Sequence, residues 1–245
     1  GIVIGASRGI GKALTIRLAT QYPNLPIIAI SSSIISSQTA TEFSQAHPNI
    51  SCFDADMSTM EGVSAVINHI QDKIRFLVYV SGVIGQLWSE NITAEDFDTV
   101  MHINSRSIFF LARGLADKNV QGSKLLVIGT PMAHKYMVPL PLYSISKAAL
   151  YMTYQVLKQE IKTTAVGSAK PGVVKTQMLD NAETKLQAEL KLPKIEVDLC
   201  AKFLAYLISD RVNSERFSET DWDVYTPDHH SEWLEDGDEP PFWVN

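Results

Sequence analysis

The sequence has little cysteine, no long apolar run and no excess of basic residues. It contains only two cysteines, Cys52 and Cys200, among 245 residues. Their spacing matches neither a metal site nor a Cys-x-x-Cys motif, so we interpret them as small buried residues in a reducing, cytoplasmic setting. No apolar run approaches the roughly 18 residues that a membrane-spanning helix needs. The net charge of −6 disfavours a nucleic-acid binder, which normally has a basic face.

A secretory signal and a domain boundary are also missing from the sequence. It begins at Gly1 directly in strand-like residues, and we therefore expect a methionine and a few strand residues to precede this numbering. No repeat, linker or break in composition divides it. A hydrophobic content of 45% supports a full core, so residues 1–245 are predicted to form a single domain.

Strand-like and helix-like segments alternate along the chain. Strands are predicted at Ile2–Ile4, Pro26–Ile30, Ile50–Phe53, Phe76–Val80, Leu125–Ile128, Thr164–Ser168 and Trp222–Thr226. Helices are predicted near residues 10–21, 37–46, 59–72, 93–117, 143–162 and 196–209. This alternation predicts an α/β fold with one doubly wound parallel sheet of about seven strands and helices on both faces. Ligands are then expected at the carboxyl ends of the strands.

Two segments near the C-terminus follow less regular patterns. The stretch 173–200 is amphipathic and follows a Pro-Gly turn, so we expect it to lie over the cleft as a lid. The tail, residues 227–245, is acidic and ends near Pro240-Pro241-Phe242-Trp243. For this tail we predict only packing of its aromatic side chains.

A glycine-rich turn lies between the first strand and the first helix. Its residues, Gly5 to Gly11, have the spacing G-x-x-x-G-x-G. Glycines let the backbone approach a pyrophosphate, whose charge is stabilised by N–H groups at the positive end of the helix dipole. The alternative is an ordinary strand–helix connection. The flanking strand and helix favour cofactor binding.

Tyr143 and Lys147 are four residues apart in a helical segment, so their side chains share one face. An ammonium beside a phenol favours the phenolate and should lower the tyrosine pKa from its usual value of about 10. The pair would then suit acid–base catalysis. Taken alone, it could equally be a surface pair.

With the glycine turn and this pair in order, the chain resembles the short-chain dehydrogenase/reductase family, in its single-domain NADP(H)-dependent form, from residue 1 to about residue 176. Thr130 precedes Tyr143 by thirteen positions and stands at the family's catalytic serine, while Asn104 stands at its mid-helix asparagine. The resemblance implies a Rossmann-like fold. The chain is also loosely similar to fungal reductases of the benzil and sepiapterin type.

The resemblance also implies roles for individual residues. Tyr143 would protonate the alkoxide, Lys147 would lower the tyrosine pKa and hold the nicotinamide ribose, and Thr130 would hydrogen-bond the carbonyl oxygen. Asn104 would order a water that links Lys147 to solvent. The implied cofactor-binding residues are Gly5, Ser7, Arg8, Gly9, Ile10, Gly11, Ser31, Asp56, Gly82, Tyr143, Lys147, Pro171, Gly172, Val174 and Thr176. No metal is expected.

Several of these residues also fit simpler interpretations. Asn104 could hydrogen-bond locally within its helix. Asp56, matched to an aspartate that holds adenine, could be a helix N-cap. Thr130 could simply end a strand, and Pro171-Gly172 could be a plain turn. Their joint occurrence at fixed spacing favours the functional interpretation.

The chain departs from the family pattern at three places. Ile4 replaces a threonine, and Tyr79-Val80-Ser81-Gly82 replaces Asn-Asn-Ala-Gly. We expect these changes to affect local rigidity and cofactor affinity rather than the fold. Thr130 keeps the hydroxyl of the usual serine but restricts χ1, and activity is expected to survive.

Cofactor choice is indicated by the end of the second strand. That strand ends in Ser31-Ser32-Ser33 without a carboxylate, and Arg8 can reach the same region, although it could instead be a solvated surface charge. A carboxylate there would favour NAD and a basic group NADP, so NADPH is predicted.

The substrate is predicted to be a small apolar or aromatic ketone, diketone or aldehyde. Candidate lining segments are 83–88, 132–142 and 176–192. Named candidates are Trp88, Met132, His134, Met137, Leu140 and Leu142, of which His134 could also be a solvent-facing loop residue. The family habit suggests a homodimer or homotetramer through 93–117 and 143–162. The rival functions are a non-catalytic NADP(H)-binding scaffold or sensor, and a different Rossmann-like enzyme such as a methyltransferase.

Overall fold

The structure is a computed structural model that describes residues 1–135, 138–186, 193–224 and 230–234. Seven strands form one sheet in the order β3-β2-β1-β4-β5-β6-β9, and every neighbouring pair is parallel. The strands are β1 (Ile2–Ile4), β2 (Ile27–Ser31), β3 (Ile50–Asp54), β4 (Ile74–Tyr79), β5 (Asn119–Ile128), β6 (Thr164–Lys170) and β9 (Trp222–Asp223). The predicted seven-stranded α/β fold is confirmed.

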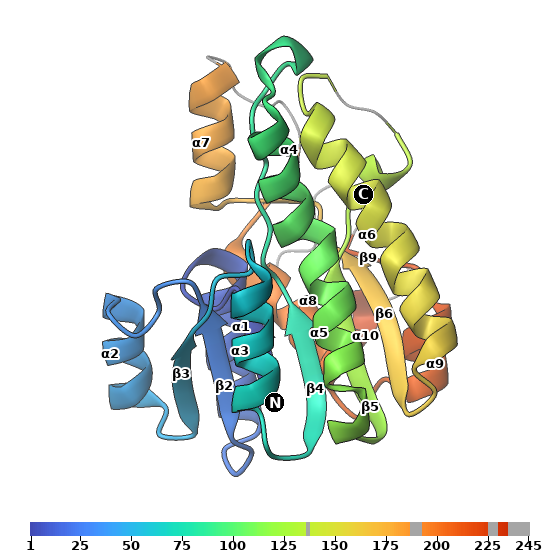
Figure 1. Ribbon diagram of the computed structural model, residues 1–245. Coiled ribbons are helices and arrows are strands. Elements are labelled where there is room, and N and C mark those ends of the chain that lie inside the picture. The colour runs from blue at the N-terminus through green and yellow to red at the C-terminus, as the bar shows by residue number, and fades with distance from the viewer. Residues whose placement is uncertain (136–137, 187–192, 225–229, 235–245) are drawn as a thin grey trace.

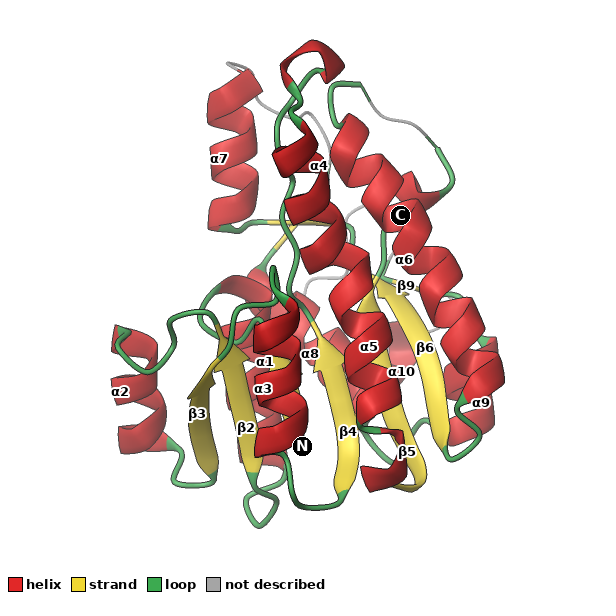
Figure 2. Cartoon of the chain, in the orientation of Figure 1, coloured by secondary structure: helices red, strands yellow, loops and turns green. Residues whose placement is uncertain are grey.

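Helices cover both faces of this sheet (Figures 1 and 2). They are α1 (Gly9–Gln21), α2 (Gln38–Ala46), α3 (Met60–His69), α4 (Ala94–Met101), α5 (Ser107–Gly114), α6 (Pro141–Glu160), α7 (Gln177–Leu186), α8 (Val197–Ile208), α9 (Ser214–Glu219) and α10 (His230–Trp233). None of the helices in the described ranges is both long and apolar enough to cross a membrane.

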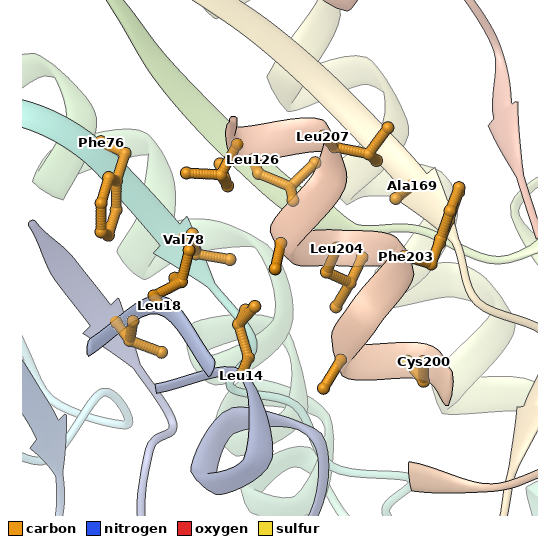
Figure 3. Close-up of a cluster of buried hydrophobic side chains, with 14 of the residues drawn as sticks. Leu14, Leu18, Phe76, Val78, Leu126, Ala169, Cys200, Phe203, Leu204 and Leu207 are labelled. Atoms are coloured by element: carbon orange, nitrogen blue, oxygen red, sulfur yellow. The ribbon is translucent and has the colours of Figure 1, made fainter. Parts of the chain in front are cut away.

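Two hydrophobic clusters, one on each side of the sheet, form the core. Figure 3 shows the first, in which Leu14 and Leu18 of α1 and Phe203 and Leu204 of α8 lie against the strands. The second joins α3, α5 and α6 to the opposite face, with residues such as Leu111 that are fully buried. A parallel sheet needs both faces covered, which explains the near-continuous apolar strands in the sequence.

The order of the strands creates the position of the site. From β1 the chain proceeds outward to β2 and β3, then crosses to β4 on the other side of β1. The connections that leave the carboxyl ends of β1 and β4 therefore run in opposite directions. This topological switch point leaves a crevice at the carboxyl ends of these two strands.

The predicted helix over 93–117 is interrupted in the structure. Between α4 and α5 lies a π-helical turn, His102–Arg106, and a 3₁₀ turn, Ala116–Lys118, follows α5. A π turn inserts a residue into the helical ladder, which apolar periodicity does not reveal. β5 also begins earlier than predicted, at Asn119, across an irregular register with β4. The short helices α9 and α10 were not predicted.

The predicted lid consists of a helix and a small sheet. α7 stands above the carboxyl ends of the strands (Figure 1), and β7 (Val173–Val174) pairs in parallel with β8 (Lys194–Ile195) beneath it. Lys175, assigned to the lid, forms an ion pair with Glu196. Residues 187–192 of the predicted lid, Thr226 of the last predicted strand and most of the tail lie outside the described residues.

Candidate active site

The glycine turn joins β1 to α1 at the switch point. Gly5 has a φ of +88°, and a Cβ at Gly11 would lie 2.0 Å from the carbonyl oxygen of Gly5, so both positions require glycine. Arg8 is the N-cap of α1 but makes no side-chain capping bond, and the first turn contains no acidic residue. The amide groups at this positive helix end are therefore suited to an anion.

A cavity of about 250 Å³, here named the glycine-turn cavity, adjoins this turn. It lies between the glycine turn, the ends of β2, β3 and β4, and the start of α7. Its lining includes Gly5, Ser7, Arg8, Gly9, Ile10, Gly11, Ser31, Asp56, Gly82 and Thr176. Residues predicted from five separate segments thus meet in one cavity, where a dinucleotide phosphate and ribose would fit the exposed helix amides.

A second cavity of about 380 Å³, the tyrosine cavity, adjoins the first. Its lining includes Thr130 and the remaining predicted cofactor-binding residues Tyr143, Lys147, Pro171, Gly172 and Val174. Ile10, Gly82 and Thr176 line both cavities, as do Val80 and Met178. The two cavities therefore form one continuous cleft with the glycine turn at one end and Tyr143 at the other.

Lys147 is buried in this cleft, with an exposed fraction of 5%, so the surface-pair alternative is wrong. Its ammonium donates a 2.8 Å hydrogen bond to the carbonyl oxygen of Ile128 and lies 5.5 Å from the centroid of the Tyr143 ring. Burial lowers the pKa of Lys147 to about 8. The lysine is thus fixed between α6 and the end of β5.

The pKa of Tyr143 moves in the direction opposite to the prediction. Burial raises the pKa of Tyr143 to about 12, whereas we expected Lys147 to lower it. The prediction is wrong for this structure because Tyr143 is half-buried in a largely apolar cleft. The cost of burying a phenolate there exceeds the effect of the nearby ammonium. Tyr143 is consequently protonated at neutral pH, the state that a proton donor requires.

Thr130 follows β5 and lines the tyrosine cavity together with Tyr143. It is also the N-cap of a 3₁₀ turn, Pro131–Ala133, where its hydroxyl accepts a weak 3.4 Å hydrogen bond from the amide of Met132. As an acceptor in that bond, the hydroxyl still has its own proton to donate into the cavity.

Asn104 is fully buried in the π turn and lines neither cavity. Its Oδ1 accepts from the amide of Val83 at 2.8 Å, and its Nδ2 donates to the Val83 carbonyl and to Ser146 Oγ, each at 2.8 Å. These partners are far away in sequence, so the local-bonding alternative is wrong. Asn104 thus fixes the loop after β4 to α6 at Ser146, the residue before Lys147. That Asn104 orders a water stays a prediction.

The residues predicted to bind the adenosine half lie around the glycine-turn cavity. Ser31 donates to Ser7 Oγ at 3.0 Å, which leaves Ser7 bridging the turn and β2. Asp56 Oδ1 accepts from the amide of Ser58 at 2.8 Å, while Thr59 is the N-cap of α3, so the N-cap alternative for Asp56 is wrong. The exposed guanidinium of Arg8 donates to Gln177 Oε1 at 3.1 Å and is therefore more than a solvated charge.

The predicted substrate residues are only partly brought together. Met132 and Leu140 line the tyrosine cavity, and α7 adds Met178, Leu179 and Ala182. His134 is an exposed turn residue, as the solvent-facing alternative predicted, and it packs edge-on against Tyr151 with ring centroids 4.4 Å apart. Trp88 is 46% exposed and Leu142 is buried, neither in the lining of this cavity, and Met137 lies outside the described residues. The lining is otherwise apolar, with Ile84, Val173 and Pro193 completing it.

Three participants were missed from the sequence. Ser146 lies inside the Tyr143–Lys147 motif, and its buried hydroxyl joins Asn104 to the carbonyl of Tyr143. The other two act through main-chain atoms of Ile128 and Val83, which no side-chain pattern could indicate. The position of Ser146, three residues after Tyr143, was the available signal. Within the described residues, no group of three His, Cys, Asp or Glu side chains could hold a metal ion.

The parallel sheet, the glycine turn at its switch point and the cleft beside it define a dinucleotide-binding protein of the Rossmann type. The chain belongs to the short chain dehydrogenase family, whose model matches residues 2–187. Proteins of this family are oxidoreductases that bind a nicotinamide cofactor, which supplies the hydride chemistry while the protein positions it.

The sequence is similar to several reductases. It is 26% identical over 197 residues to NADPH-dependent aldehyde reductase 2 of Arabidopsis thaliana, covering 72% of each chain. It is 24% identical over 220 residues to versicolorin reductase stcU of Emericella nidulans, covering 84% of this chain and 81% of the relative. It is 28% identical over 189 residues to hydroxynaphthalene reductase-like protein Arp2 of Metarhizium brunneum, covering 73% of this chain and 69% of the relative.

Solved structures confirm the fold. A short chain dehydrogenase from Burkholderia cenocepacia in complex with NADP superposes with a TM-score of 0.73 at 20% identity, covering 91% of this chain and 93% of that one. A short chain dehydrogenase family protein from Francisella tularensis gives a TM-score of 0.74 at 18% identity, covering 91% and 93%.

Proposed function

We propose that this protein is an NADPH-dependent reductase that reduces the carbonyl group of a small apolar or aromatic ketone, diketone or aldehyde. The supporting observation is the single cleft in which the glycine turn meets Thr130, Tyr143 and Lys147. A non-catalytic scaffold would not need these polar groups at the wall of an otherwise apolar cavity.

Each polar group has a distinct task in this proposal. Tyr143, whose phenol is protonated at neutral pH, donates its phenolic proton to the oxygen that gains negative charge. Thr130 donates a hydrogen bond to the same oxygen, which strengthens as charge develops. Lys147 stabilises the resulting phenolate and is itself oriented by Ile128. The nicotinamide, when bound, supplies the hydride.

The preference for NADPH is supported by the wall of the glycine-turn cavity. Arg8, Ser31 and Ser32 line its β2 side, where a 2′-phosphate would meet one cation and two hydroxyls. A guanidinium pairs with phosphate through charge-assisted hydrogen bonds. The aldehyde reductase of Arabidopsis thaliana to which this chain is similar is NADPH-dependent by name, which agrees with this preference.

The substrate class is supported by the tyrosine cavity. Its volume of about 380 Å³ and its lining of Ile84, Met132, Leu140 and Met178 suit a compact apolar molecule with one reacting oxygen. One of the similar reductases is named for hydroxynaphthalene, an aromatic compound.

The test follows NADPH absorbance with purified protein and a panel of diketones, quinones, aromatic ketones and aldehydes. Tyr143→Phe should lower kcat by a factor of about 10² to 10⁴ while NADPH binding stays measurable. Tyr154→Phe is the matched control, because Tyr154 is a partly buried tyrosine on the same helix that does not line the tyrosine cavity. Full turnover by Tyr143→Phe would show that Tyr143 is not the proton donor. NADPH binding without turnover of any panel member would favour the scaffold.

We also propose that the protein assembles as a homodimer or homotetramer through 93–117 and 143–162, the segments that contain α4, α5 and α6. Ile145, Met152 and Val156 are spaced by seven and four residues on α6, so they share a face, and they are 48%, 59% and 37% exposed. Phe110 of the neighbouring α5 is 41% exposed. Light scattering should give twice or four times the monomer mass of 27.1 kDa, and Met152→Lys should lower it. A monomeric wild type would contradict this.

A reducing, cytoplasmic setting is the last part of the proposal. It is supported by Cys52 and Cys200, neither of which forms a disulfide in the structure.

A further inference from the structure

Tyr79 replaces the first asparagine of the family's Asn-Asn-Ala-Gly at the end of β4. Its side chain is 1% exposed and belongs to the cluster on the α3, α5 and α6 side of the sheet. Its hydroxyl donates a 2.5 Å hydrogen bond to the carbonyl oxygen of Ile103, twenty-four residues along the chain. The aromatic side chain therefore connects the sheet to the π turn.

The carbonyl that Tyr79 contacts lies in an unusual backbone segment. In the π turn His102–Arg106, the amide of Ser107 bonds to the carbonyl of His102, five residues back. The Ser107 hydroxyl bonds to the same carbonyl at 2.6 Å. π turns are less favourable than α-helix and persist where neighbouring groups stabilise them, frequently at functional sites. Tyr79 and Ser107 supply such contacts from outside the helical ladder.

Asn104 is the residue that follows Ile103, so any shift of this carbonyl moves the asparagine. All three polar hydrogen-bonding groups of Asn104 are engaged, with Val83 on one side and Ser146 on the other. Gly82 lies close to both Asn104 and Lys147: a Cβ at Gly82 would be 3.4 Å from Asn104 Oδ1 and 3.7 Å from Lys147 Nζ. Asn104 thus fixes the wall of the cleft against the helix that holds Tyr143 and Lys147.

We propose that Tyr79 is a positioning residue: its hydroxyl holds the Ile103 carbonyl, which fixes Asn104 and, through Val83 and Ser146, the geometry around Lys147. This inference rests on the proposed reductase function. It also gives the departure at Tyr79 a compensating role, because the lost asparagine is replaced by a side chain that reaches the turn directly. Burial raises the pKa of Tyr79, so its hydroxyl remains a donor at neutral pH.

Tyr79→Phe tests the proposal because it keeps the ring and removes only the hydroxyl. We expect kcat to fall about tenfold, with KM for the carbonyl compound and Kd for NADPH changed less than about twofold, since misplacement affects the reaction more than binding. In the Asn104→Ala background, Tyr79→Phe should cause no further loss of kcat, because both changes disturb the same unit. If Tyr79→Phe lowers kcat by the same factor in the wild-type and in the Asn104→Ala background, the proposal is wrong.

Tyr206→Phe is the matched control. Tyr206 is also a buried tyrosine, 6% exposed, whose hydroxyl bonds to Glu232 on the α8 side of the sheet. We expect it to lower the melting temperature as Tyr79→Phe does but to leave kcat unchanged. A loss of kcat in Tyr79→Phe no larger than in this control would contradict the proposal.

A measurement without turnover separates this inference from the proposed function. Hydrogen exchange of the amides in 103–107 should accelerate about tenfold in Tyr79→Phe and stay unchanged in Tyr206→Phe. If the wild type reduces no carbonyl but this exchange accelerates, the reductase function fails and the structural coupling stands. If exchange in 103–107 is unchanged, the positioning role is wrong whatever the activity.

Discussion

The ammonium of Lys147 donates a 2.8 Å hydrogen bond to the carbonyl oxygen of Ile128, the last residue of β5. The bond links α6 to a strand end that lies two residues before Thr130. Lys147 therefore orients the two elements that hold the proton donor and the hydroxyl of the cleft, in addition to bringing its charge near Tyr143. We expect the burial of Lys147 to make the free energy of unfolding depend on pH.

Lys147→Met should become less favourable relative to the wild type as the pH rises. Burial lowers the pKa of Lys147 from 10.5 to about 8. Below about pH 8 the lysine is charged in both the folded and unfolded states, so the folded protein bears the full cost of burial, at most about 3 kcal/mol. Between these two pKa values the folded state loses its proton first, and the cost decreases. Melting curves of both proteins from about pH 7 to about pH 10 should show the Tm of the variant minus that of the wild type decreasing as the pH rises; a Tm difference independent of pH would contradict the burial argument.

Thr130→Ala should lower kcat by a factor of about 10² to 10³, because a single donor to the developing oxyanion is lost. Thr130→Ser is the matched variant: it keeps the hydroxyl and removes only a methyl group, so kcat should stay within about threefold. Steady-state kinetics with one carbonyl substrate and saturating NADPH would measure both. Equal losses in the two variants would show that the methyl group, rather than the hydroxyl, matters.

Arg8→Ala should lower kcat/KM for NADPH at least about tenfold while leaving that for NADH nearly unchanged, because only the 2′-phosphate needs the guanidinium. Lys12→Ala is a suitable control, since Lys12 lies on the same helix but forms an ion pair with Glu42. The ratio of the two specificity constants is the measurement. Comparable kcat/KM for NADH and NADPH in the wild type would refute the NADPH preference itself.

The sequence predicted the sheet, the glycine turn and the order of the site residues because these depend on local rules. Gly5 and Gly11 are required by close backbone contacts within one short turn, and Tyr143 and Lys147 share a face by helical spacing alone. The strands of a buried parallel sheet are apolar throughout, which makes them easy to recognise.

What the sequence could not predict depends on long-range contacts. The π turn at His102–Arg106 is stabilised from outside by Tyr79, whose hydroxyl bonds to Ile103 twenty-four residues along the chain, and this contact has no pattern in the sequence. The direction of the Tyr143 pKa shift required knowledge of burial, since spacing shows only that a charge is near.

Lys124→Met should be strongly destabilising although the residue lies outside the cleft. Lys124 of β5 is 7% exposed, and its ammonium donates to the carbonyl oxygens of Leu207, Ser209 and Val212 at 2.9, 2.6 and 2.5 Å. Without it, these carbonyls at and just after the end of α8 lose a charged donor in a site that water barely reaches, a loss of about 3 kcal/mol or roughly 6–12 °C in Tm. Lys118→Met is the comparison, because half-buried Lys118 donates in the same way to the carbonyls of Ile67 and Ile70 at the end of α3. Water can replace that lysine, so its loss should be about 1 kcal/mol or less. Thermal unfolding of the two variants measures both losses. Losses in the ratio of the hydrogen bonds removed, three against two, would contradict the role of burial.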